Sequence, residues 1–264
     1  MKTTKEKLIY ACLGLVAGLM ILPMTCNARG MGMGMGMGMG MGRGGGQGAG
    51  LSASIVSLPY QELSPEEESG LLKMREEEKL ARDVYQALFA KWGITVFRNI
   101  STAEQRHMDA VKALLDKYGL QDPVTDPTPG LFTDPELQGL YSSLVKKGRG
   151  SMLAALQVGA TIEDLDIKDL YDLLDQTDNT DIQLVYQNLA KGSRNHLRAF
   201  VSLLTANGDT YEAQFLSQEQ IDAIVSSPRE RGRVDADGKP VFGSGRGRQG
   251  RHTAQNGVRM LLAK

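Results

Sequence analysis

Acidic and histidine side chains interrupt the apolar stripes of four segments that have helical periodicity. In each segment, apolar residues recur every three or four positions, a spacing typical of a helix that faces a core. The residues that break these stripes are Glu78, Glu104, His107, Glu163, Asp166 and His196. Because carboxylate oxygens and imidazole nitrogens suit divalent transition metals, the pattern predicts an interior metal site.

The cost of burying charge supports this prediction. Glu104 and His107 are one helical turn apart, so their side chains lie on one face. A carboxylate in a core is unstable unless a cation, a basic side chain or a proton accompanies it. Helical bundles hold metal ions among carboxylates and Glu-x-x-His pairs from facing helices. We therefore expect metal ions as the principal partners.

Each of these residues also has an interpretation without metal. Glu104 could complete a capping box with Ser101, and residues 76–78 could form a solvated acidic face. The two histidines could be core residues bonded to Asp or Tyr. Four arginines could neutralise the same carboxylates, namely Arg82, Arg106, Arg194 and Arg198. Two inward histidines together with at least three inward carboxylates favour the metal hypothesis.

Four long helices must position these side chains. A capping box from Ser64 to Glu67, with Pro at the first helical position, predicts a first helix over residues 64–91. The second helix is expected over residues 101–118. Residues 121–133 then form a loop long enough to cross a bundle.

The second half of the chain has the same pattern. A short helix is expected over residues 135–147. The third long helix is expected over residues 151–175, with an interruption at Gly159 left open, and the fourth from the cap signals before residue 181 to residue 205. A last short helix is expected over residues 217–226. The chain is thus predicted to be all-α.

Two stretches resemble the first helix pair of rubrerythrins and related ferritin-like proteins: EKLARDVY at residues 78–85 and ISTAEQRH at residues 100–107. Three more resemble an uncharacterised prokaryotic ferritin-like family, the domain of unknown function 2202, at residues 76–82, 162–167 and 193–200. The resemblance covers residues 68–225. It implies a ferritin-like four-helix bundle with a crossover connection, and no function is established for that family.

Carried over by position, the resemblance implies a site for two metal ions. It makes Glu78 the terminal carboxylate of the first helix, Glu104 a bridging carboxylate and His107 an imidazole ligand. Further carboxylates would come from the third helix as Glu163 and Asp166, and a second imidazole from the fourth helix as His196.

One position departs from the ferritin-like pattern. A second Glu-x-x-His pair would place Glu at position 193, where this chain has Ser193. Asp166 could supply the missing oxygen from the third helix. Otherwise the second metal would be weakly bound, absent or of another kind.

If iron, or iron with manganese, is bound, the expected chemistry is oxidation of that metal by dioxygen or peroxide. The protein would then be a di-iron-type oxidoreductase, with Tyr85 and Tyr186 as candidate electron donors. Tyrosine at a helix packing position is, however, often structural. The alternative is a non-catalytic envelope or interaction module, with which Ser193 is consistent.

The first 28 residues have the order of a secretory signal. Three lysines precede an apolar run over residues 8–22, and a small-residue site ends at Ala28. We therefore expect export to the periplasm or the exterior, or membrane anchoring if the leader is not cleaved. Lipidation at Cys26 is a further alternative. Both cysteines lie in this leader, so cleavage would leave a chain without disulfides or thiolate sites.

Low-complexity segments are expected on both sides of the helical domain, which is predicted over residues 64–227. Residues 29–63 contain an alternating Gly-Met tract and are interpreted as a linker. Its thioethers suit Cu(I), so copper handling is a second site hypothesis, with Met31, Met33, Met35, Met37, Met39 and Met41 as ligands. Residues 228–264 are interpreted as a disordered basic tail.

The charge balance bears on the remaining partners. The formal net charge is -1, which gives no whole-chain argument for nucleic acid. We expect no specific nucleic-acid partner and no stable membrane span after leader cleavage. The sequence leaves a homo-oligomer open.

Overall fold

The computed structural model describes residue 51 and residues 54–241. The expected leader, the Gly-Met tract and the last part of the tail lie outside this range. Within it the chain is mostly helical, which confirms the all-α prediction. The elements are α3 (Pro65–Trp92), α4 (Thr95–Tyr118), α5 (Pro135–Gly148), α6 (Met152–Leu174), α7 (Thr180–Ala206), α8 (Gln218–Ser226), β1 (Arg233–Val234) and β2 (Pro240–Val241).

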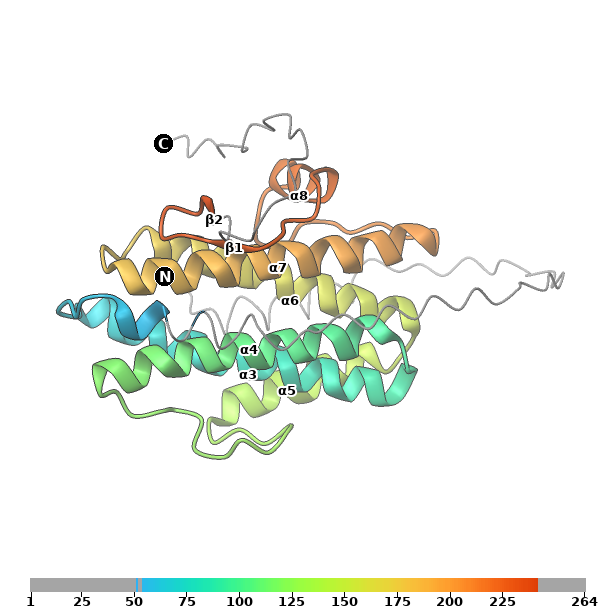
Figure 1. Ribbon diagram of the computed structural model, residues 1–264. Helices are drawn as coiled ribbons and strands as arrows, with labels where there is room; N and C mark the ends of the chain where they lie inside the picture. The colour runs from blue at the N-terminus through green and yellow to red at the C-terminus, as the bar shows by residue number, and fades with distance from the viewer. Residues whose placement is uncertain (1–50, 52–53, 242–264) are drawn as a thin grey trace, which may run out of the picture.

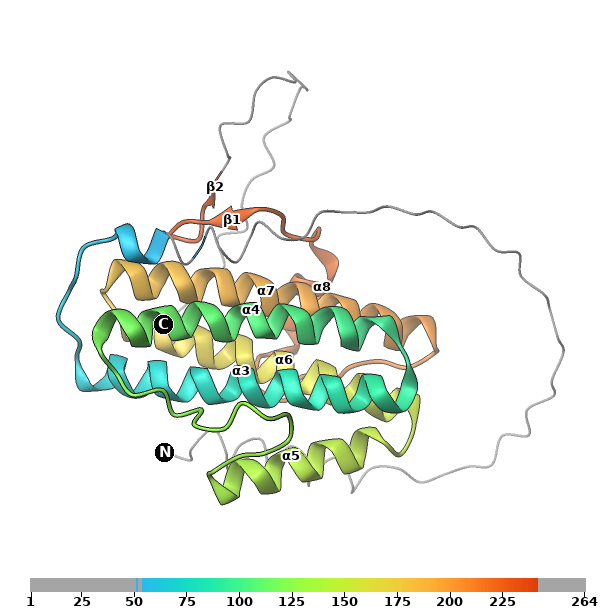
Figure 2. The ribbon, with the colours of Figure 1, turned by 60° about the horizontal axis from the view of Figure 1, so that its bottom comes forward.

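Four long helices, α3, α4, α6 and α7, lie side by side (Figures 1 and 2). A tight turn at Gly93, whose φ is 68°, reverses the chain between α3 and α4. Helix α3 contacts α4 and α6, and α7 contacts the same two helices, so the four inner faces enclose a common interior. Helix α5 packs on α3 and α6, and α8 packs on α7.

The beginning of α3 is as expected, whereas that of α4 is not. Ser64 and Glu67 form the reciprocal capping box. Helix α4 begins at Thr95 rather than near Ser101. The sequence did not predict this start because the cap residue, Ile94, makes no side-chain capping bond and so leaves no capping pattern in the sequence. Ser101 instead donates to the carbonyl oxygen of Arg98 within the helix. The capping-box interpretation of Glu104 is therefore wrong.

Helix α6 runs through Gly159 without a break. A Cβ atom at this position would lie 2.5 Å from Cε1 of Phe200 on α7. The glycine is therefore a close packing contact between two helices and not an interruption.

Segments on both sides of the expected domain pack on the helices. Ile55, placed in the linker by the sequence, is fully buried. The sequence analysis placed Glu230 and Val234 in the disordered tail. In the structure Glu230 pairs with Arg194 on α7, and Val234 is buried in β1, which contacts α7. Strands β1 and β2 pair antiparallel in this segment. Residues 54–63 and 228–241 therefore contain residues that contact the helices. These isolated anchoring residues have no periodicity and gave no sequence signal, and the domain boundaries stay a prediction.

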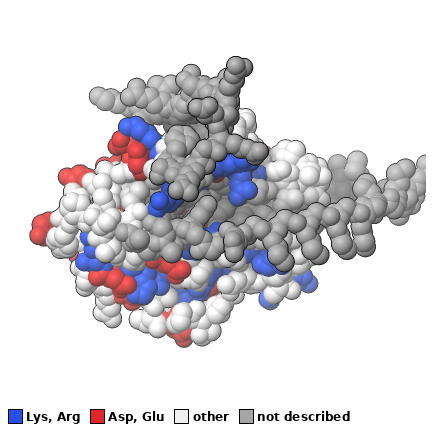
Figure 3. All heavy atoms as spheres, in the orientation of Figure 1, with Lys and Arg blue, Asp and Glu red and all other residues white. Residues whose placement is uncertain are grey.

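Acidic and basic side chains lie interspersed on the described part of the face in Figure 3. None of the described helices has the length and apolarity needed to cross a membrane.

Candidate metal centre

A polar layer divides the interior of the four helices. The apolar core forms two clusters, one around Tyr85, Phe97 and Phe200 and the other around Met74 and Leu114. On α3, α4 and α7 the predicted site residues lie between the segments that supply these clusters: Glu78 on α3, Glu104 and His107 on α4, and His196 on α7. On α6, Glu163 and Asp166 lie within the last turns that contribute to the first cluster, before the second begins at Leu170. The chain therefore interrupts its core at one level on all four helices.

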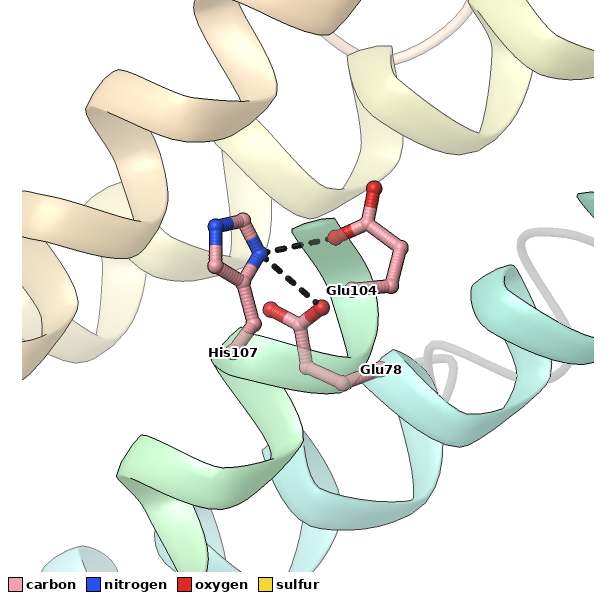
Figure 4. A group of neighbouring side chains, drawn as sticks. All are labelled: Glu78, Glu104 and His107. Atoms are coloured by element: carbon pink, nitrogen blue, oxygen red, sulfur yellow. Dashed lines mark hydrogen bonds and ion pairs between the residues drawn. The ribbon is translucent and has the colours of Figure 1, made fainter. Parts of the chain in front are cut away.

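The first group of this layer joins α3 and α4. Nδ1 of His107 lies 3.2 Å from Oε2 of Glu78 and 2.7 Å from Oε2 of Glu104 (Figure 4). Both carboxylate side chains are 1% exposed. The three side chains converge, with their ligand atoms within 4.8 Å of one another.

The second group uses the other oxygen of Glu104. Nδ1 of His196 lies 2.9 Å from Oε1 of Glu104 and 3.4 Å from Oε2 of Glu163. These ligand atoms also lie within 4.8 Å of one another. Glu104 thus belongs to both groups and directs one oxygen to each.

The separations suit atoms that share an ion. Two ligand atoms bound at roughly 2.1 Å, with bonds at right angles, lie about 3 Å apart. Within residues 54–241, both oxygens of Glu104, Oε2 of Glu163 and Nδ1 of His196 have no hydrogen-bond partner, despite the short distances. Buried polar atoms without partners are costly. The donor set and these unsatisfied atoms therefore fit divalent cations.

Arginine and lysine side chains do not take the place of a metal cation in this layer. Arg82 pairs with Asp83, both Arg194 and Arg198 pair with Glu230, and Arg106 is exposed. In the described part of the chain, ion pairs of Lys and Arg reach none of the four site carboxylates. The ion-pair alternative is wrong for these arginines.

The match with known proteins falls on the same helices. The family described as "Uncharacterized protein domain (DUF2202)" matches residues 67–228. The chain belongs to this family. "Uncharacterized protein MJ0754" from Methanocaldococcus jannaschii is 55% identical over 178 residues, which cover 67% of this chain and 96% of that protein.

A solved structure is also similar to this DUF2202 chain. Its title is "Crystal structure of hypothetical protein MJ0754 from Methanococcus jannaschii DSM 2661". The two superpose with a TM-score of 0.65 at 55% identity, covering 66% of this chain and 99% of the other. The expected resemblance to this family is confirmed.

Asp166 and Ser193, the two residues on which the second metal position was expected to depend, are both buried in the DUF2202 chain but lie outside the two groups of converging ligand atoms. Asp166 is 5% exposed and its Oδ2 has no hydrogen-bond partner in the described residues, but it belongs to neither group of converging ligand atoms. Its ligand role stays a prediction. Ser193 is buried and donates within its own helix to the carbonyl oxygen of Leu189 at 3.3 Å.

The two tyrosines singled out from the sequence differ in their surroundings. The hydroxyl of Tyr85 donates to Oε1 of Glu163 at 2.6 Å. The hydroxyl of Tyr186 is buried in the second apolar cluster and has no hydrogen-bond partner within the described residues. Tyr85 therefore contacts a site carboxylate directly.

A second acidic layer of the DUF2202 chain was missed from the sequence. Lys73 lies 3.7 Å from Glu77 and 3.2 Å from Asp169, and both carboxylates are largely buried. Asp169 follows Asp166 by three residues, so extending the helical step from Glu163 would have indicated it.

The charges of the site shift its pKa values strongly. Burial raises the pKa of Glu78 to about 7, although His107 opposes the shift. Burial would lower the pKa of His107, but Glu78 and Glu104 raise it to about 9. The pKa of Asp166 lies well above its usual range because of burial and the surrounding carboxylates. The metal-free site therefore retains protons at neutral pH.

These shifts predict that the metal-free DUF2202 protein loses stability as pH rises. His107 has a pKa of 6.5 in the unfolded chain and of about 9 in the fold, so its protonated form stabilises the fold. This stabilisation is fully present below pH 6.5 and is lost as the pH rises through about 9. Glu78 acts in the same direction: its pKa rises from the ordinary 4.5 to about 7 in the fold, so its contribution to stability is lost as pH rises through about 7.

We expect the melting temperature with chelator to fall from pH 6 to pH 9 by on the order of 5 °C. Metal binding displaces protons, so added metal should raise the melting temperature more at pH 9 than at pH 6. Thermal unfolding followed by circular dichroism checks both trends. A metal-free melting temperature that rises over this range would contradict the assignment.

Proposed function

We propose that this protein is an exported, ferritin-like four-helix-bundle protein that binds two transition-metal ions, iron or iron with manganese. The observation that carries the proposal is Glu104, whose side chain is fully buried and shared by two carboxylate-histidine groups. A carboxylate with this environment needs neighbouring cations. Export enters the proposal through the leader expected over residues 1–28.

Each residue has a role in this proposal. Glu78 and His107 would hold one ion, Glu163 and His196 would hold the other, and Glu104 would contribute one oxygen to each. Asp166 supplies a further oxygen from α6, in place of the carboxylate that Ser193 lacks. The four negative charges of these carboxylates balance the four positive charges of two divalent ions, which lowers the electrostatic cost of burying the carboxylates.

Bound iron would supply electron transfer to dioxygen or peroxide, and the reaction we propose is oxidation of the metal by one of them. The chain's own contribution is to hold the carboxylates and to limit water. Glu104 and Glu163 are fully buried, whereas the side chains of His107 and His196 are 13% and 11% exposed. Tyr85 fixes the orientation of Glu163 through its hydroxyl, and such support from outside the ligand set tunes a metal site.

Elemental analysis of the purified full chain tests the proposal. The protein is loaded with Fe, Mn, Zn and Cu available and then passed over a desalting column. About two hard ions per chain are expected, the number that bundles with such ligand sets hold. Retention of no metal would reject the proposal and favour the interaction module. Retention of Cu(I) that disappears on deleting residues 30–42 would instead favour copper handling by the Gly-Met tract.

A further inference from the structure

Gly192 on α7 lies directly against the imidazole ring of His107 on α4. A Cβ atom at position 192 would be 2.5 Å from Nε2 and 2.6 Å from Cε1 of that ring. Non-bonded heavy atoms prefer separations of about 3.5–4.0 Å, so even a methyl group would not fit there. The ring occupies the space that a side chain at this position would need.

The ring has neighbours at both of its edges. Its Nδ1 faces Glu78 and Glu104, and its second nitrogen lies on the edge turned away from them (Figure 4). That second nitrogen, Nε2, is the atom nearest to the position of the missing Cβ atom. A shift of the ring away from α7 would therefore move Nδ1 relative to the two carboxylates.

Helix propensity does not explain this glycine. Glycine is among the poorest helix formers, yet position 192 is in the middle of a helix that runs from Thr180 to Ala206. The three atoms nearest to the position of a Cβ there, leaving aside the backbone of its own helix, all belong to His107. The close contact of this glycine is thus with one side chain of the site, and Glu163 and His196 are not among these nearest atoms.

We infer that Gly192 is a positioning residue for His107. Because position 192 of α7 has no side chain, the imidazole can pack against the helix there and direct Nδ1 toward Glu78 and Glu104. This inference rests on the proposed function for its effect on metal binding. It implies that a side chain at position 192 disables one metal position and spares the group of Glu104, Glu163 and His196.

Metal binding by the full-length Gly192→Ala variant tests the inference. With Fe(II) or Co(II) as the probe, the first ion should bind as in the wild type, and the affinity for the second should fall about 10- to 100-fold. At a free Co(II) concentration that fills both positions of the wild type but only the tighter position of the variant, the visible absorption of the variant should reach about half of the wild-type amplitude. Equal affinities and amplitudes for the variant and the wild type would overturn the inference.

Gly148→Ala is the matched control. A Cβ at Gly148 would lie 2.6 Å from Cδ2 of Leu88, so it creates a similar clash within an apolar contact. This variant should keep both ions. Loss of one ion from both variants would show that the effect is general loosening of the helices, which contradicts a specific role for Gly192.

A double-mutant cycle tests the contact without metal. Gly192→Ala should lower the melting temperature in the presence of His107, but leave it unchanged or raise it in the His107→Ala background, where space is available. If the wild-type protein binds no metal but the two substitutions show this coupling, the proposed function is rejected, while the packing of Gly192 against His107 remains supported. The same loss in both backgrounds would overturn the inference itself.

Discussion

If the protein binds two metal ions as proposed, replacing Glu104 by Gln is expected to remove both of them. The two oxygens of this residue serve different groups, one with His107 at 2.7 Å and one with His196 at 2.9 Å. Glutamine keeps the shape but offers one oxygen and no charge, so neither group retains two carboxylates. Replacing Glu78 or Glu163 removes a ligand from one group only. The expected content therefore falls from about two ions to none, measured by elemental analysis after desalting.

Asp109→Asn is the matched control for Glu104→Gln. Asp109 lies on the exposed side of the same helix, where it accepts a hydrogen bond from Gln105. This variant should retain both ions. The helical circular dichroism of both variants should match the wild type at 20 °C, so that a loss of metal reflects the ligand and not unfolding. A Glu104→Gln protein that keeps two ions would refute the shared-carboxylate site.

The two groups could be anticipated from the sequence because buried charge is a strong anomaly. Glu78, Glu104 and Glu163 stood at positions where an apolar residue was expected, and the structure buries all three. The periodicity that gives a helix its inward face was sufficient to place them on inward faces, whereas their common level along the helices became visible only in the structure. It could not rank the two acids of α6, because Glu163 and Asp166 both face inward and only the first converges with a histidine.

What the sequence could not show depends on contacts between distant segments. Gly192 has no side chain to break a pattern, and its role comes only from a ring on another helix. Glu230 lies beyond the last periodic segment, yet its carboxylate joins Arg194 and Arg198 on α7. The start of α4 was missed for a local reason, since Ile94 caps the helix without a side-chain bond.

A second large effect is expected away from the candidate metal centre, in the loop that crosses between α4 and α5. Asp83 is completely buried and accepts hydrogen bonds from Lys79 at 2.6 Å, from Arg82 at 2.8 Å and from the backbone N–H of Gly130 at 2.9 Å. Lys79 also donates to the carbonyl oxygen of Leu131 at 2.8 Å. This cluster fastens the loop to α3 through buried charge.

Asp83→Asn is expected to destabilise the protein by about 3–5 kcal/mol, because it leaves Lys79, only 2% exposed, without its counter-ion. Lys112 and Asp116 form a pair with the same spacing on α4, but their side chains are 44% and 64% exposed. Asp116→Asn should therefore cost at most about 1 kcal/mol. Urea unfolding of the metal-free proteins measures both free energies. Because the penalty comes from an unpaired buried ammonium, adding Lys79→Met to Asp83→Asn should recover part of the loss; equal costs for the two single substitutions would contradict this explanation.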